Sequence, residues 1–322
     1  MRVIRKLLCA CALPLVAATV MAQPYPNHPV RVISPTPAGT QPDLIARFIT
    51  RPMGVTLNQS FVVENIPGSG GIAAINALMG SKPDGYTLIM LDASHWAINP
   101  ATRANLSYDP ATSFTPIGLP MTSSLFLAVN AAVPAKSMAE LIAYIRSKPG
   151  EVNYGSSGIG SVHHLTIEAF RQALSLNMLH VPYKGSSESV PAMVAGQVQM
   201  VVSSYSSIEQ QAKAGRIRIL AANTQKRSSL VPDIPAMAET VPGIDFPGQT
   251  GLVGPAGIPR DIVDKLSGAM REAIRQPEVL AQFRTAGVEP SEDTSPDYFA
   301  KRMRDDRVKY TAIIRAANIP IQ

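Results

Sequence analysis

Cysteine is almost missing from this sequence of 322 residues. Its two cysteines, Cys9 and Cys11, both lie in an apolar segment at the N-terminus. Beyond that segment no disulfide framework, thiolate nucleophile or cysteine-ligated metal site is possible. No HExxH-like pattern occurs either, and the adjacent His163 and His164 would point in different directions on a helix. We therefore expect neither a metal site nor a cofactor.

Aromatic residues are also few, at 6% of the chain, and lysine and arginine are spread out rather than clustered. Both observations argue against nucleic acid as a partner. The formal net charge is +6, and loss of the three basic residues Arg2, Arg5 and Lys6 with the N-terminal segment would leave +3. A mild positive excess of this kind suits an anionic solute.

Long apolar runs are absent after the N-terminal segment. Within it, the basic residues precede the uncharged stretch Leu7–Met21, which ends at the small residue Ala22. This order is typical of a secretory signal peptide, and the stretch is too short for a membrane anchor. We predict that residues 1–22 are removed by cleavage after Ala22 and that the mature protein is soluble in the periplasm.

The remaining sequence alternates short apolar runs with helical patterns, which indicates an α/β fold. Two successive α/β units suggest two lobes. The first reads strand, helix, strand, helix, strand, and this order implies a mainly parallel sheet with right-handed crossovers. The expected strands are Val30–Ser34, Phe61–Glu64, Tyr86–Asp92, Leu125–Asn130, Val152–Gly155, Met178–Val181, Val198–Ser203 and Ile217–Ala222. The expected helices are Asp43–Met53, Ile72–Met79, Ser137–Lys148, Val162–Ala173, Ser189–Ala195, Pro259–Arg275 and Pro296–Ala317.

Two motifs could indicate an enzyme. Gly68–Ala73 has the GxGxxA form of a dinucleotide-binding turn, and Asp92 ends the next strand where a ribose partner would lie. Export from the cytoplasm argues against the use of a soluble nicotinamide cofactor. We therefore interpret the Gly68–Ala73 segment as a tight turn that needs glycine for its backbone conformation. Ser157 or Ser161 with a nearby histidine could form a hydrolase site, but the spacing does not give a GxSxG elbow. We expect no enzyme activity.

An anion-binding site requires fewer specific residues than either enzyme site. The glycine- and serine-rich loop Ser156–Ser161 begins a helix and offers unpaired backbone N–H groups at the positive end of the helix dipole. The loop Pro35–Asp43 has the same construction after the first strand. Two such loops, one in each α/β unit, could face each other and share one ligand. His95 and Trp96 follow the third strand, where the strand ends of an α/β sheet collect ligand contacts.

Many short segments in order resemble the Bug family of periplasmic solute receptors, which includes the receptor component of tripartite tricarboxylate transporters. The resemblance covers essentially the whole mature chain. The matching segments are Tyr25-Pro26, Pro29-Val30-Arg31, Val63-Glu64-Asn65, Pro67-Gly68, Gly70-Gly71, Pro83 to Leu88, Ile98-Asn99-Pro100, Tyr108-Asp109-Pro110, Val133 to Ser137, Lys148-Pro149-Gly150, Ser156-Ser157-Gly158, His180 to Gly185, Gly196 to Gln199 and Gly254 to Gly257.

The resemblance implies a two-lobed periplasmic binding protein of type II, a "Venus flytrap" with paired hinge crossings. Residues 23–125 would form the first part of lobe one, 126–225 lobe two, and 226–322 would return to lobe one. Backbone amides of two facing loops, Ala38–Asp43 and Ser156–Ser161, would hold a carboxylate of a dicarboxylic, tricarboxylic or aromatic acid. The candidate ligand-binding residues are Thr36, Ala38, Gly39, Thr40, Gln41, Asp43, Ser94, His95, Ser156, Ser157, Gly158, Gly160, Ser161, Tyr183, Ser203 and Ser204.

The chain departs from the family pattern at two places. Thr36 replaces an aromatic residue before the first loop, and Thr40 and Gln41 add side chains where relatives carry glycines. Ser203-Ser204 stands where relatives often have Asp-Asn, which should disfavour a ligand bearing an ammonium group. We therefore expect a plain carboxylic acid rather than an amino acid.

The predicted function is capture of a small organic acid by hinge closure, with the ligand favouring the closed form. The protein would be a monomer and would deliver the acid to tripartite tricarboxylate transporter membrane subunits. Three alternatives remain: an exported Ser/His hydrolase, an oxidoreductase that uses the Gly68 turn, and a solute sensor that signals rather than transports.

Overall fold

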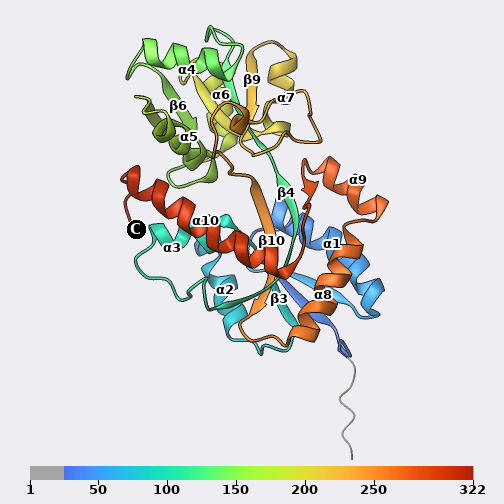
Figure 1. Cartoon of the computed structure of the whole chain (residues 1–322). Coiled ribbons are helices and arrows are strands. Elements are labelled where there is room, and N and C mark those ends of the chain that lie inside the picture. The colour runs from blue at the N-terminus through green and yellow to red at the C-terminus, as the bar shows by residue number, and fades with distance from the viewer. Residues whose placement is uncertain (1–24, 322) are drawn as a thin grey trace, which may run out of the picture.

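The computed structural model describes residues 25–321, which form two lobes joined by two crossing segments (Figure 1). The predicted signal peptide, with its cleavage after Ala22, lies outside the described residues. Each lobe contains one sheet with helices packed against it, so the predicted two-lobed α/β architecture is confirmed. Among residues 25–321, no helix has both the length and the apolarity to span a bilayer.

The first lobe has a six-stranded sheet in the order β11-β4-β10-β3-β1-β2. Strand β1 pairs in parallel with β2 and β3, as predicted, whereas β10 runs antiparallel to both β3 and β4. The strands are β1 Val30–Ser34, β2 Phe61–Asn65, β3 Thr87–Asp92, β4 Phe114–Ser123, β10 Gly248–Pro255 and β11 Glu289–Pro290. The helices are α1 Gln41–Leu57, α2 Ile72–Met79, α3 Asn99–Thr102, α8 Arg260–Ala273, α9 Pro277–Thr285 and α10 Pro296–Ala316.

The second lobe has a five-stranded sheet in the order β7-β6-β8-β5-β9. Strand β6 is parallel to β7 and β8, and β5 is antiparallel to β8 and β9. The strands are β5 Leu125–Asn130, β6 Asn153–Ser156, β7 Leu179–Pro182, β8 Met200–Ser204 and β9 Ile217–Ala222. The helices are α4 Met138–Ser147, α5 Val162–Ala173, α6 Ser186–Val194 and α7 Tyr205–Lys213.

Two long strands missed by the sequence prediction, β4 and β10, carry the chain between the lobes. Strand β4 contains Pro116 and Pro120, and β10 contains three glycines and ends at Pro255. These residue types are depleted in strands, so the segments resemble loops in the sequence. The two strands pair with each other despite register shifts around Leu252. Helices α7 and α9 were also missed, and in α7 only Ile208 is buried.

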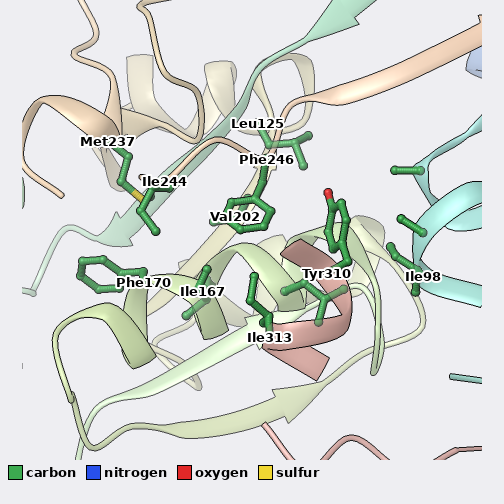
Figure 2. Packing of buried hydrophobic residues seen from close by; sticks show 14 of the residues in the cluster. Ile98, Leu125, Ile167, Phe170, Val202, Met237, Ile244, Phe246, Tyr310 and Ile313 are labelled. Carbon is green, nitrogen blue, oxygen red and sulfur yellow. The ribbon is translucent and has the colours of Figure 1, made fainter. Parts of the chain in front are cut away.

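One hydrophobic cluster runs through both lobes (Figure 2). It contains Val202 and Phe170 from the second lobe, Phe246 from the return crossing, and Tyr310 and Ile313 from α10. The rings of Phe246 and Tyr310 meet edge to face with centroids 5.5 Å apart. Helix α10 packs on the first-lobe sheet and also reaches α5, where Gln172 Nε2 donates to the Ile313 carbonyl at 3.3 Å. The lobes therefore share a core beside the crossings.

Asn223, fully buried, connects the two crossing segments. Its backbone N–H donates to the Leu125 carbonyl at 2.8 Å, and its Oδ1 accepts from the Leu125 N–H at 2.9 Å. Its carbonyl accepts from the Phe246 N–H at 2.8 Å, and its Nδ2 donates to the Phe246 carbonyl at 2.5 Å and to Thr166 Oγ1 at 3.3 Å. One side chain thus holds both segments where they enter the second lobe.

We predict that Asn223→Ala destabilises the protein by about 2–5 kcal/mol, because the Leu125 N–H and the Phe246 carbonyl would be left buried without partners. Urea unfolding measures the change. Asn105→Ala, at an exposed position, serves as the control. Equal stability of the two variants would contradict a structural role for Asn223.

Candidate functional site

The sheet pairing places the loops predicted to bind ligand at the edges of the two sheets that face each other. In the first lobe, Asp92 at the end of β3 is paired with Thr250, close to the start of β10 at the crossing. Strand β1 is parallel to β3, so the loop after β1 lies at this same edge. In the second lobe, Ser204 at the end of β8 is opposite Leu125 at the crossing, and β6 is parallel to β8. The loop after β6 therefore faces the first lobe.

One close approach shows that the second-lobe loop reaches the first lobe. A Cβ built on Gly160 would lie 4.0 Å from the Cγ2 methyl of Thr102 in α3. Two helices begin at these loops, α1 in the first lobe and α5 in the second, and their N-termini supply positive partial charge. The arrangement suits an anion between the lobes.

In the first loop, Asp43 is buried and acts as an organising group. It accepts from the Gly39 N–H at 2.8 Å and from Asn65 Nδ2 at 2.8 Å, and it pairs with Arg47 at 2.9 Å. Burial raises the pKa of the Asp43 carboxyl, but the hydrogen bonds from Arg47, Gly39 and Asn65 outweigh burial and leave it below its usual value. An ionised Asp43 would repel a carboxylate, so its contribution is to shape the loop.

Side-chain hydroxyls of the first loop are also engaged within it. Thr40 Oγ1 donates to the Pro37 carbonyl at 2.7 Å, and Thr36 Oγ1 lies 2.6 Å from Thr40 Oγ1. By contrast, the backbone N–H groups of Thr36, Ala38 and Gln41 have no hydrogen-bond partner among the described residues. These three amides are among the donors that the loop leaves for a ligand.

In the second-lobe loop, several of the predicted donors are used internally. Ser161 caps α5 by accepting from the His164 N–H at 3.2 Å, and its own N–H donates to the Gly158 carbonyl at 3.2 Å. The Gly158 N–H donates to Ser156 Oγ, and the Gly160 N–H donates to His164 Nδ1, both at 3.1 Å.

The donors that remain in this loop are the backbone N–H groups of Ser157 and Ile159, which have no partner in the described part of the chain. Ser157 Oγ lies 3.2 Å from Ser186 Oγ. The Ile159 side chain is 52% exposed at the tip of the loop. The sequence analysis included Ile159 in the predicted loop Ser156–Ser161 but not among the individually named candidate residues, and its position between two glycines was the available signal.

A stack of aromatic rings supports the second-lobe loop from below. His164 and His180 stack with centroids 3.8 Å apart, and Tyr154 stacks on His180 at 4.9 Å. His180 Nε2 lies 2.7 Å from Ser156 Oγ, and Tyr154 donates to Glu168, which is paired with Arg171 at 2.8 Å.

Burial, together with the neighbouring His180, lowers the pKa of His164 to about 4, so His164 is neutral at physiological pH. A neutral ring is required, because its Nδ1 must accept the Gly160 N–H. No cluster of three or more potential ligand residues that could hold a metal occurs in residues 25–321.

The other predicted residues have mixed placements. Ser94 and His95 begin a turn of π-helix after β3, and His95 is buried and pairs with Asp92 at 2.8 Å. The ring of Tyr183 packs against Gly155, where an added Cβ would lie 3.2 Å from it. Ser203 is fully buried, and Ser204 Oγ lies 2.7 Å from Ser207 Oγ. Of these residues, Ser94, Tyr183 and Ser204 retain partial exposure.

In the Gly68 turn, Gly71 is required by the position of His95. A Cβ on Gly71 would lie 2.2 Å from His95 Nε2, and Gly71 has a positive φ of 87°. Asp92, which would have to bind a ribose in a dinucleotide site, is already paired with His95. The resemblance to a dinucleotide fingerprint is therefore explained by packing.

The sequence model of the tripartite tricarboxylate transporter family receptor, TctC, matches residues 45–319. The chain belongs to this receptor family. A UPF0065 protein of Cupriavidus necator is 32% identical over 90% of the chain and 88% of that protein. BugT of Bordetella pertussis is 29% identical over 93% of the chain and 92% of BugT. The predicted Bug and TctC resemblance is confirmed.

Solved structures of receptors with related sequences have the same fold. A Rhodopseudomonas palustris protein solved with adipate is 30% identical and superposes with a TM-score of 0.73, covering 92% of this chain and 99% of that one. MatC of the same organism, solved with bound malate, is 27% identical with a TM-score of 0.70 and coverages of 90% and 100%. TctC receptors are thus two-lobed binding proteins, in agreement with the two sheets described above.

Because His164 is neutral when folded, acid should destabilise this TctC receptor. Its pKa of about 4 lies below the usual 6.5, so the unfolded chain binds the proton more readily. The stability is complete above about pH 6.5 and is lost as the pH falls toward 4. At pH 5 His164 alone should contribute a loss of about 2 kcal/mol, to which His163 adds because burial also lowers its pKa to about 4. Urea unfolding at pH 7 and pH 5 measures it.

His164→Gln removes the titrating ring and should reduce the difference between the two pH values, whereas the exposed control His28→Gln should not. An identical pH dependence in wild type and His164→Gln would refute the role of His164.

Proposed function

We propose that this chain is a periplasmic receptor that captures a small carboxylate-bearing solute between its lobes and delivers it to a membrane transporter. The observation that carries the proposal is the set of unpaired backbone amides on the two facing loops. Thr36, Ala38 and Gln41 supply them in the first lobe, and Ser157 and Ile159 in the second. Each set lies at the N-terminus of a helix, where the dipole favours an anion.

The relatives support the chemistry of the solute, since one was solved with adipate and another with malate. Both compounds are dicarboxylic acids without an ammonium group. In this chain two carboxylates close to the loops, the buried Asp43 and the partly exposed Asp92, are already paired with Arg47 and His95. The absence of a free carboxylate at these two positions supports a plain acid rather than an amino acid.

The serine residues offer little support for a hydrolase. Ser156 is the serine that lies beside a histidine ring, but it is fully buried and also contacts Gly158. Ser157 Oγ contacts Ser186 Oγ of α6, and Ser161 Oγ donates to the Gly158 carbonyl. We infer a receptor without catalytic activity, secreted by cleavage after Ala22, acting as a monomer with tripartite tricarboxylate transporter membrane subunits.

Hinge closure is the proposed mechanism, because a ligand that bridges both loops binds the closed form better than the open form. Small-angle X-ray scattering of the purified protein should show a smaller radius of gyration with saturating adipate or malate, whichever binds. A bound ligand without any compaction would contradict closure.

A charge placed in the first loop tests the anion site. Ala38→Glu should weaken carboxylate binding about 100-fold or more, because the new carboxylate would lie beside the unpaired amides and repel the ligand. Ala38→Gln has nearly the same size without the charge and should retain most of the affinity. Isothermal titration calorimetry compares the two variants. Equal affinities would exclude the first loop as the anion site.

A further inference from the structure

A half-buried arginine without a partner lies at the edge of the first lobe. Arg103 directly follows α3, and its guanidinium makes no hydrogen bond and no ion pair with any residue in 25–321. Every other arginine in that range is either exposed or bonded to an acidic side chain or a carbonyl group. Guanidinium groups out of full contact with water are normally matched to carboxylates or phosphates.

The surroundings of Arg103 place it beside the proposed solute site. Its Nη2 lies 2.7 Å from the position that a Cβ on Gly70 would occupy, so the guanidinium lies against the bare backbone of the β2–α2 turn. Asn99 of α3 holds this turn by donating to the Gly70 carbonyl at 3.3 Å. The preceding residue, Thr102, is the one whose methyl group approaches Gly160 of the second-lobe loop. Arg103 is therefore next to the closest approach described above.

No acidic side chain among residues 25–321 forms an ion pair with Arg103. Asp92 is paired with His95 at 2.8 Å, and Asp109 is paired with Arg307 at 3.5 Å. Tyr108 responds to the free charge. Its burial raises the pKa of the hydroxyl to about 12, and the positive charge of Arg103 opposes that rise. The Tyr108 hydroxyl donates to the His95 carbonyl at 2.7 Å, three residues after the end of β3.

We propose that Arg103 binds a second carboxylate of the solute. This inference rests on the proposed function: the loop amides hold one carboxylate, and the guanidinium holds the other. Arg103 is then the residue that distinguishes a dicarboxylic acid from a monocarboxylic acid of the same length. Its fork of N–H donors matches the two oxygens of a carboxylate, and a charged hydrogen bond of this kind is stronger than one from a neutral donor.

The test uses calorimetry on the mature receptor with two matched series of probes. One series is the linear α,ω-dicarboxylates from malonate to suberate, and the other is the monocarboxylates of the same chain lengths. Arg103→Gln should weaken binding of the best dicarboxylate about 10- to 100-fold and leave the matched monocarboxylate unchanged. Arg103→Lys should restore part of the loss, because lysine keeps the charge without the fork.

Arg146→Gln is the matched control, since Arg146 is an exposed arginine in α4 of the second lobe that forms no ion pair with another described residue. It should change neither series. Thermal unfolding of each variant without ligand distinguishes binding from folding, because a merely structural Arg103 would lower the melting temperature and weaken both series alike.

The outcomes separate this inference from the proposed function. If wild type binds dicarboxylates and monocarboxylates equally, or if Arg103→Gln weakens both alike, Arg103 is not the second subsite, and the carboxylate receptor still stands. If the wild-type protein binds neither series, the result contradicts the proposed function for these acids and the inference about Arg103 with it. A loss confined to the dicarboxylates supports the assignment.

Discussion

The hydrogen bonds of Asn223 are the constraint on which the arrangement of the two lobes depends. They join this residue to Leu125 on the outgoing segment and to Phe246 on the returning segment. The two crossing segments are therefore held together where they leave the second lobe. The chain between this clamp and the first-lobe sheet is short on each side, namely Ser124 on one and Pro247 on the other. A Cβ on Gly248 would lie 2.3 Å from Ser123 Oγ, so the two crossings also pack closely.

The shared hydrophobic core also restricts how the two lobes can move relative to each other. Tyr310 and Ile313 of α10 belong to the same cluster as Phe170 and Val202 of the second lobe, so separating them would expose buried apolar surface (Figure 2). Hinge movement can preserve that contact only by turning about an axis near it. The loops after β1 and β6 then undergo the larger displacement, which is what capture of a solute between them requires.

Sequence patterns predicted elements whose apolar residues alternate regularly. Helices Ile72–Met79 and Val162–Ala173 and strands Leu125–Asn130 and Ile217–Ala222 have the predicted bounds. Strands β4 and β10 were missed because prolines and glycines such as Pro120 and Gly248 interrupt their apolar pattern. These two strands nevertheless carry the chain between the lobes.

The candidate loops could be predicted from the sequence, but the backbone donors that they leave unpaired could not. Glycine- and serine-rich composition indicated both loops, whereas the consumption of the Gly39 N–H by Asp43 and of the Gly160 N–H by His164 depends on side chains packed in three dimensions. Arg103 carries no motif at all. Its distinguishing property is the absence of a partner among the described residues, which only the fold reveals.

The hydroxyl groups of the first loop explain why we assign binding to amides and Arg103 rather than to the threonines. Thr40 gives its single hydroxyl proton to the Pro37 carbonyl, so the 2.6 Å contact requires Thr36 to donate to Thr40. Ser34 Oγ lies 3.2 Å from Thr36 Oγ1, whose proton is already used, so Ser34 must be the donor in this contact. The hydroxyl protons of Ser34, Thr36 and Thr40 are therefore all donated to acceptors within this segment. Thr36 and Thr40 thus add no donor for an anion, and our proposal leaves the charge of a second carboxylate to the guanidinium of Arg103.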